Sequence, residues 1–265
     1  FPLGWGAYIS KYKKSNKKNN ICKITNKMIP KKPRLPIAQI LIMGFFPSFL
    51  KVFLYKVRGY KINKNVKIGL GSVIISDDVI IGSNTKISYG TVIRAKRLRI
   101  GRYVKIGSAT FIDTNNVEIG DDAKINEKVI IGGIKWPESS IIIGKRVTIM
   151  LNSFINPTKP IIIGDDSGIG GHCLLFTHGS WLSELDGFPV SFESITIGKK
   201  VWLPWRVFIM PGVKIGNNVV IGANSLVNQN FPSNTLIAGS PAKIIKENYP
   251  VKPSNQERHI KIIRI

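Results

Sequence analysis

The chain has 265 residues, 43% of them hydrophobic and 25 of them glycine, which is enough for a sizeable packed core and excludes a fully disordered protein. The two cysteines, Cys22 and Cys173, lie far apart without a CxxC pair, so the sequence predicts neither a disulfide framework nor a cysteine zinc site, and a reducing compartment such as the cytoplasm fits best. The net charge of +24 predicts attraction to anions and does not choose among nucleic acid, anionic lipid and phosphorylated ligands.

We expect residues 1–60 to form a basic and apolar segment that is separate from the domain after it. Residues 11–34 contain ten Lys or Arg and no acid, and an apolar run follows at residues 35–50. This run of 16 residues is shorter than the roughly 20 residues that span a bilayer. Two interpretations stay open: a helix that lies on an anionic membrane surface, or a helix that covers the open end of the next domain.

An aliphatic residue recurs every sixth position across residues 61–236. The positions form eight triplets, and 21 of the 24 residues are isoleucine. They are Ile62, Ile68, Ile74, Ile81, Ile87, Ile93, Ile100, Ile106, Ile112, Ile119, Ile125, Ile131, Ile143, Ile149, Ile155, Ile163, Ile169, Leu175, Ile197, Leu203, Ile209, Ile215, Ile221 and Val227.

A six-residue period does not match an α-helix, although it is a multiple of the strand period. If each six-residue unit is a short strand and a corner, three units close one triangular coil with the aliphatic side chains inside. The sequence therefore predicts an all-β fold, a parallel β-helix of about eight triangular coils, with residues 61–236 as its domain.

Departures from the six-residue spacing occur only after the third unit of a coil, so all insertions are predicted to leave one edge of the β-helix. The two longest lie at residues 134–142 and 176–196, and long insertions are where repeat proteins usually carry function. Glycine follows the first aliphatic residue of most coils, where we expect a Cβ to be crowded.

After the β-helix, residues 237–265 are predicted to form a short helix and a tail. Ser240 is a good N-cap residue, and Pro241 fits the first helical position. We therefore expect a short helix over residues 242–247.

Four segments carry a resemblance to a known family: Ile197-Gly-Lys-Lys-Val-Trp202, Pro211-Gly212-Val213-Lys-Ile-Gly216, Ile221-Gly-Ala223 and Ala238-Gly-Ser-Pro-Ala-Lys243. Together with the repeat, they resemble the hexapeptide-repeat acyltransferases over residues 60–247. The similarity is closest to the maltose, galactoside and xenobiotic O-acetyltransferase branch and to the polysaccharide O-acetyltransferases. The resemblance implies a left-handed β-helix, a homotrimer with three active sites between subunits, and acetyl-CoA as acyl donor without a metal.

His178 is the predicted catalytic base. The chain has three histidines, of which His259 lies in the tail, and His172 is expected at a corner or wall of a coil. His178 precedes Trp202 by 24 residues, which is similar to the spacing of the family's catalytic histidine and tryptophan. A neutral imidazole accepts the proton of a hydroxyl as its oxygen attacks the thioester, and backbone N–H groups stabilise the oxyanion. An acyl-enzyme on Cys173, which neighbours His172, is disfavoured.

A carboxylate is expected to orient the imidazole of the base. Glu184, Asp186 and Glu193 all lie on the long insertion, and the sequence does not choose among them. Asn152 on a preceding coil is a candidate for binding the acceptor hydroxyl.

By the same resemblance, coenzyme A is expected to contact two tryptophans, an amide pair and two lysines. The matching positions are Trp202, Trp205, Asn228, Gln229, Lys243 and Lys246. Lysines suit the phosphates of a long anionic ligand. The chain departs from the family at Pro204 and Trp205, and in having Asn228-Gln229 where a Thr-Lys type pair is usual.

The predicted function is acetyl transfer to a sugar hydroxyl in surface-polysaccharide biosynthesis, with direct attack in a ternary complex, in the cytoplasm or at the inner face of the membrane. The acceptor is a small-molecule or lipid-linked sugar, and peripheral contact with an anionic membrane is one expected partner. N-acetylation of an amino sugar and a non-catalytic scaffold or membrane-surface protein are the alternatives. A zinc-dependent γ-class carbonic anhydrase is rejected, because it needs three zinc-binding histidines at a subunit interface and only two histidines lie in the β-helix. Nucleic-acid binding is rejected as well, because the sequence contains no nucleic-acid reader motif.

Overall fold

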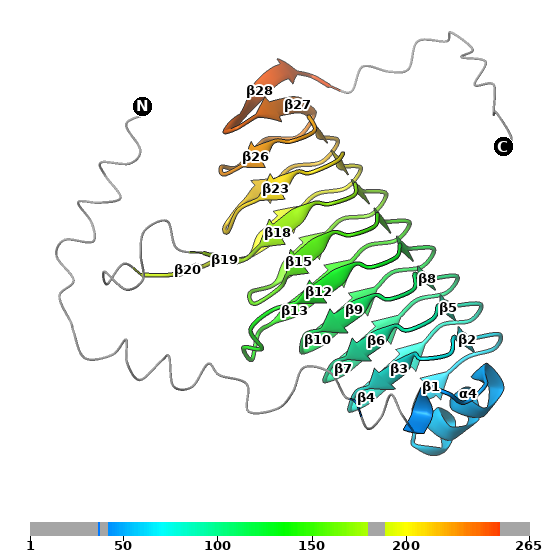
Figure 1. Cartoon of the computed structure of the whole chain (residues 1–265). Helices are drawn as coiled ribbons and strands as arrows, with labels where there is room; N and C mark the ends of the chain where they lie inside the picture. The colour runs from blue at the N-terminus through cyan, green and yellow to red at the C-terminus, as the bar shows by residue number, and fades with distance from the viewer. Residues whose placement is uncertain (1–36, 38–41, 180–188, 250–265) are drawn as a thin grey trace, which may run out of the picture. The chain divides into compact units, whose positions relative to one another are not determined.

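A computed structural model describes residue 37, residues 42–179 and residues 189–249. Its main feature is a stack of coils that runs from β1 beside α4 to the β27–β28 hairpin (Figure 1). Each coil contributes one short strand to each of three parallel sheets, which we name A, B and C. Eight coils are complete, and a ninth is partial, so the predicted parallel β-helix is confirmed.

Sheet A has eight strands: β1 (Lys61–Ile62), β4 (Asp78–Ile81), β7 (Arg97–Ile100), β10 (Asn116–Ile119), β13 (Ser140–Ile143), β16 (Ile161–Ile163), β21 (Ile195–Ile197) and β24 (Lys214–Ile215). Sheet B has ten strands: β2 (Lys67–Ile68), β5 (Lys86–Ile87), β8 (Lys105–Ile106), β11 (Lys124–Ile125), β14 (Thr148–Ile149), β17 (Gly168–Ile169), β22 (Trp202–Leu203), β25 (Val220–Ile221), β27 (Thr235–Gly239) and β28 (Ala242–Glu247).

Sheet C has eight strands: β3 (Val73–Ile75), β6 (Val92–Arg94), β9 (Phe111–Asp113), β12 (Ile130–Gly132), β15 (Phe154–Asn156), β18 (Leu174–Phe176), β23 (Phe208–Ile209) and β26 (Leu226–Val227). Two further strands, β19 (His178–Gly179) and β20 (Ser191–Phe192), pair with each other outside the three sheets.

The aliphatic residues of the six-residue rhythm form the core. Ile62 pairs in register with Ile81, and Ile81 with Ile100, so each residue stacks on its equivalent in the next coil. All 24 side chains are at most 6% exposed. β-Branched side chains suit this ladder because they pack well on extended strands.

The glycines after the first aliphatic residue stand where neighbouring coils approach closely. A Cβ on Gly82 would overlap the backbone of Gly101, and a Cβ on Gly164 would overlap that of Gly198. Backbone φ is not positive at these glycines. Crowding between coils, as expected from the sequence, is therefore the reason for glycine here.

The corner between sheets C and A, which we call the insertion edge, carries every insertion. Residues 133–139 leave it between β12 and β13, and residues 177–194 leave it between β18 and β21. The corner between sheets B and C keeps a constant length instead. It repeats a residue with positive φ on successive coils, including Asn152 at 56° and His172 at 57°.

Helix α4 (Ser48–Val57) covers the amino-terminal end of the stack. The first coil has no preceding coil, so its outer backbone groups need other partners. Ser48 Oγ accepts from the Ile68 N–H at 2.9 Å, and Tyr55 Oη accepts from the Ile74 N–H at 2.9 Å. The fully buried Lys51 donates from Nζ to the carbonyl of Gly69 at 2.6 Å. Of the two roles that the sequence left open for the apolar run at residues 35–50, covering the β-helix holds for α4, which overlaps the end of this run. Residues 35, 36 and 38–41 of the run lie outside the described part of the chain.

The predicted carboxy-terminal helix is wrong, because residues 242–247 form strand β28. β28 pairs antiparallel with β27, which itself adds to β25 as part of the ninth coil. Gly239 has φ +109°, a left-handed conformation that favours glycine and lets the chain reverse. The unpaired edge of the last coil therefore overrides the local Ser-Pro capping signal.

Candidate functional site

His178 lies on the insertion edge, on the short ribbon that the chain forms as it leaves sheet C. The residue belongs to β19, and it pairs with Phe192 of β20, where the chain returns. The Glu193 N–H donates to the Thr177 carbonyl at 2.9 Å and closes the base of this ribbon. The imidazole is therefore held next to the wall of the sixth coil.

Aromatic rings from both long insertions stack beside His178. The Phe192 ring is stacked on the imidazole with centroids 5.4 Å apart and planes 12° apart. Trp136, from the first insertion, stacks with Phe192 at 4.2 Å. The Lys159 ammonium lies 4.9 Å from the Trp136 ring centroid. The result is a continuous stack of a cation and three rings, which we call the aromatic stack.

The first insertion is tied to the β-helix on both sides of Trp136. Asn115 donates from Nδ2 to the Trp136 carbonyl at 2.5 Å, and the Lys135 ammonium forms an ion pair with Asp113. Asp113, whose side chain is 7% exposed, is also paired with Arg94. Trp136 is thus fixed on a rigid support rather than on a free loop.

Burial sets the protonation of His178. The imidazole is half-buried, and desolvation lowers its pKa below the usual value, because burial disfavours the charged form. Its Nδ1 atom is buried and has no hydrogen-bond partner among the residues that the structure describes. His178 is therefore neutral at neutral pH, the state in which an imidazole acts as a base.

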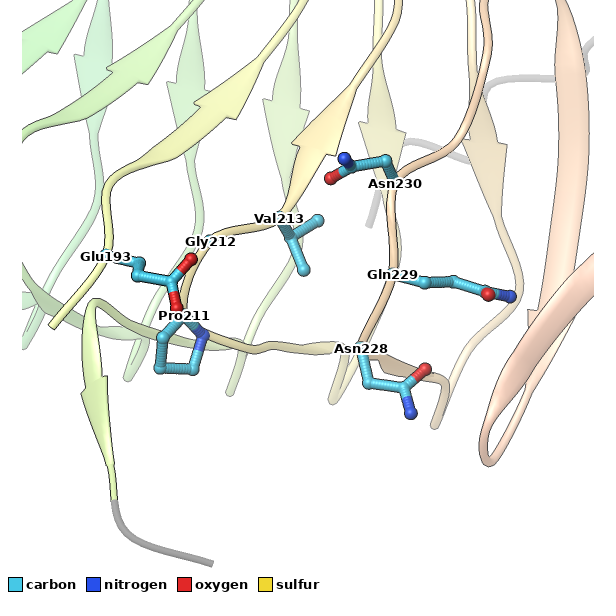
Figure 2. A pocket seen from close by; sticks show the side chains of 7 residues that line it. All are labelled: Glu193, Pro211, Gly212, Val213, Asn228, Gln229 and Asn230. Carbon is cyan, nitrogen blue, oxygen red and sulfur yellow. The ribbon is translucent and has the colours of Figure 1, made fainter. Parts of the chain in front are cut away.

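Of the three candidate carboxylates, Glu184 and Asp186 lie outside the described residues. Glu193 is described, is exposed, and sits beside a hollow of about 300 Å³ on the insertion edge. Figure 2 shows the Glu193 carboxylate over Pro211 and Gly212 of the next coil. The hollow is lined by Glu193, Pro211, Gly212, Val213, Asn228, Gln229 and Asn230.

The amide pair expected to contact coenzyme A lines this hollow. Gln229 is partly engaged, because its Nε2 donates to the Ala242 carbonyl at 3.3 Å and so fixes the start of β28. Asn228 is exposed. Two of the predicted coenzyme A residues therefore lie on the same edge of the β-helix as His178.

The two tryptophans expected to contact coenzyme A lie on another face of the molecule. Trp202 is 42% exposed on sheet B, and its ring covers Gly168 on the preceding coil, where a Cβ would overlap it. Trp205, 46% exposed, covers Gly171 in the same way at the corner between sheets B and C. Each exposed ring is thus seated on a glycine.

Asn152 and His172 join Trp205 at that corner and lie apart from His178. The Asn152 amide and His172 Nε2 are 3.5 Å apart, and the rings of His172 and Trp205 are tilted with centroids 6.0 Å apart. The corner position expected for His172 is confirmed. The role of Asn152 in acceptor binding stays a prediction.

The remaining candidates occupy the end of the stack and the core. Lys243 and Lys246 are exposed on β28, opposite Ala238 and Leu236 of β27. Cys173 is fully buried, its Sγ lies 3.0 Å from the Pro204 carbonyl, and burial raises its pKa. A thiol in this state is a poor nucleophile, which argues against an acyl-enzyme.

Sequence reasoning missed Trp136 and Phe192. They lie on different insertions, so no spacing pattern links them, and neither belongs to the segments that carry the family resemblance. The only signal for them was the presence of large aromatic side chains in the two longest insertions.

Sequence comparisons agree with this geometry. The family described as "Bacterial transferase hexapeptide (six repeats)" matches residues 194–229, which are the seventh coil and most of the eighth. A putative colanic acid biosynthesis acetyltransferase, WcaF of Escherichia coli, is 32% identical over 124 residues, which are 40% of this chain and 68% of that protein. The chain belongs to the hexapeptide-repeat acyltransferase family.

Two other relatives of this hexapeptide-repeat acyltransferase are, like WcaF, proteins of Escherichia coli. The putative lipopolysaccharide biosynthesis O-acetyl transferase WbbJ is 54% identical over 55 residues, 21% of this chain and 28% of that protein. Galactoside O-acetyltransferase is 36% identical over 116 residues, 41% of this chain and 55% of that protein. In these two matches the chain spans less than two thirds of the relative's length.

Proposed function

We propose that this hexapeptide-repeat acyltransferase transfers an acetyl group from acetyl-CoA to a hydroxyl of a sugar in surface-polysaccharide biosynthesis. The observation that carries the proposal is the neutral, half-buried His178 on the same edge as a hollow lined by Asn228 and Gln229. Two of the relatives, WbbJ and WcaF, are named for polysaccharide biosynthesis, which supports a glycan acceptor.

In the proposed reaction, His178 accepts the proton of the acceptor hydroxyl while the oxygen attacks the thioester carbonyl. The thiolate of coenzyme A leaves as the tetrahedral intermediate collapses, and the imidazolium returns the proton to the sulfur. Because the thioester already provides a good leaving group, the protein has to activate only the acceptor. Backbone N–H groups stabilise the oxyanion in this scheme.

The aromatic stack supports the proposed base rather than the acceptor. The Phe192 ring lies between the His178 and Trp136 rings, so it holds the imidazole in place and limits its access to water. The support for a sugar acceptor is therefore the names of the relatives WbbJ and WcaF. The carboxylate that orients His178 remains open between Glu193, which lines the hollow, and Glu184 and Asp186.

We further infer that the active enzyme is a homotrimer. On sheet C, the residue before each core aliphatic is apolar in all eight coils; Val73 and Val92 are already buried, and the six later residues are partly or well exposed and give a stripe formed by Phe111, Ile130, Phe154, Leu174, Phe208 and Leu226. A continuous apolar stripe of this length favours burial against other subunits.

The separation of the candidate residues also supports an active site shared between subunits. His178 and the hollow lie on the insertion edge, whereas Trp202 lies on sheet B and Trp205 at the corner between sheets B and C. Within one rigid β-helix the insertion edge cannot approach sheet B or the corner between sheets B and C. In a three-fold assembly, the insertion edge of one subunit can face a different side of its neighbour.

The test is release of free thiol from acetyl-CoA in the presence of a panel of sugars, with products identified by mass spectrometry. The purified protein is expected to acetylate at least one sugar hydroxyl, and His178→Ala is expected to lose about a hundredfold or more in rate with the oligomer intact. Including amino sugars in the panel separates O-acetylation from N-acetylation. Unchanged turnover in His178→Ala would end this proposal, and no turnover with any acceptor would favour a non-catalytic scaffold.

A further inference from the structure

The helix that covers the β-helix has two different faces. Ser48, Lys51 and Tyr55 face the first coil and satisfy its backbone groups. The opposite face presents Phe49, Phe53 and Val57, which are 77%, 61% and 73% exposed. Phe45, in the turn before the helix, is 69% exposed, and we call these four residues the apolar tip.

Covering the end of the stack does not explain this apolar face. The hydrogen bonds to the first coil come from the buried face alone, so polar residues on the outer face would leave the cap intact. Four adjacent, mostly exposed apolar side chains keep a patch in water at a free-energy cost, and such patches mark interaction sites. The apolar tip therefore needs a partner that buries it.

The surroundings of the apolar tip are strongly basic. Residues 42–76 contain six Lys or Arg and no Asp or Glu. Beside the helix, four lysines on sheet B pair in register on successive coils, in the order Lys67, Lys86, Lys105 and Lys124. Like charges directly opposite each other on neighbouring strands destabilise a sheet, so this ladder costs stability unless anions neutralise it.

The apolar and the basic features meet in one groove. A hollow of about 790 Å³ lies between α4 and sheet B and is lined by Phe49 and Ser48 on the helix side. Lys67, Lys86 and Lys105 line its other side. An apolar edge next to a row of ammonium groups is complementary to the boundary between acyl chains and anionic headgroups in a bilayer.

We propose that the apolar tip and the lysine ladder dock this protein onto the surface of a bilayer that contains anionic phospholipid. The aromatic side chains enter the interface, and the lysines bind phosphate groups at the edge of the groove. Helix α4 has 10 residues and lies at the surface, because roughly 20 residues are needed to span a bilayer. This proposal does not depend on the acetyl-transfer reaction, since none of these residues belongs to the candidate active site.

The test is co-sedimentation of the full chain with vesicles of phosphatidylcholine alone and with vesicles of phosphatidylcholine and phosphatidylglycerol in a three-to-one ratio. We expect binding to the anionic vesicles only, weakened by added salt. The double variant Phe49→Ser/Phe53→Ser is expected to bind about tenfold or more weakly, because two aromatic side chains no longer enter the interface. Lys67→Glu/Lys86→Glu is expected to lose binding to a similar degree.

The matched control is Lys128→Glu/Lys200→Glu, which makes the same change in net charge at exposed corners of later coils. This control is expected to bind the anionic vesicles nearly as well as the unchanged protein, and all variants are expected to stay folded, as a cooperative melting transition would show. Equal loss in the control, or full binding by the phenylalanine variant, would overturn the proposal.

Two other occupants of the same surface give different results. If the apolar tip were a contact between copies of this chain, the phenylalanine variant would change the oligomeric mass measured by light scattering. If the lysine ladder were a track for an acidic polysaccharide, only the lysine variant would lose binding to alginate, and vesicles would not bind. Either result would replace the membrane by another partner.

Discussion

At the scale of single residues, the environment of His178 decides its chemistry more than its position does. The imidazole is stacked on Phe192 and shielded from water, so its pKa is lowered and the neutral form persists. In the proposed reaction the imidazole is active only when neutral, so activity is lost as the pH falls through this pKa. The enzyme is therefore expected to keep its activity at more acidic pH than an ordinary histidine would allow.

Replacing the stacking partner tests this account. Phe192→Ala admits water to the imidazole, so the pKa of His178 should rise toward its unperturbed value near 6.5. The acid limb of kcat/KM against pH should therefore move to higher pH. Tyr89→Ala, at an exposed position on an early coil, serves as the control. A profile that stays in place would show that Phe192 does not set the protonation of the base.

His178 could be singled out as the candidate base from the sequence because histidines are few and because its spacing to Trp202 follows the family resemblance; its role stays a prediction. Its neighbours could not. Trp136 approaches Phe192 only because both insertions leave the same edge, and their contact depends on how each insertion folds back. The positions of Glu184 and Asp186 stay predictions, since both lie outside the described residues.

At the scale of elements, close approach between coils limits which residues follow each core aliphatic. Gly82→Ala places a methyl group against the backbone of Gly101, which has no flexible side chain to move aside. We expect a loss of about 2 kcal/mol in the free energy of unfolding, the usual cost of an overpacked interior. Chemical denaturation of the unchanged protein and the variant measures the difference.

Gly132→Ala is the control for this effect. A Cβ on Gly132 would make ordinary contacts, the nearest at 3.4 Å from the Asp113 carbonyl oxygen. This substitution should change the free energy of unfolding by less than about 1 kcal/mol. Similar losses in both variants would show that the crowding between coils does not govern the choice of glycine.

The core positions of the β-helix could be predicted one by one, because the same aliphatic position repeats on every coil. An error in placing one coil therefore does not shift the register of the next coils. The end of the stack could not. Ser240 and Pro241 form a good local signal for a helix, but the last coil leaves backbone groups that β27 and β28 satisfy. Tertiary pairing therefore overrode local preference at the carboxy-terminal end of the repeat.

At the scale of the whole molecule, the proposed trimer with active sites between subunits can be tested by mixing variants. His178→Ala and Trp202→Ala are each expected to be inactive alone. If the two variants are unfolded together and refolded as mixed trimers, each mixed trimer contains one junction with both residues intact, which gives about a quarter of the unchanged activity at equal mixing.

Size-exclusion chromatography with light scattering checks that the mixed samples are trimeric. Refolding each variant separately and then combining them is the control, and it should give no recovery. Absence of activity in properly formed mixed trimers would place His178 and Trp202 in the same subunit's site, or remove Trp202 from the reaction.

The regular stacking of coils gives the protein a fixed internal scale. His178 follows the sixth coil, and α4 lies against the first, so five strand spacings, or about 24 Å, separate the coil that carries the base from the coil under the helix. If the apolar tip rests on a bilayer, the coil number sets the distance from the docked end of the stack to the candidate base. Deleting one coil from the middle of the stack would lower the base by about 5 Å without changing any residue around it. The length of the β-helix would then fix the distance between the docked end of the molecule and the candidate base.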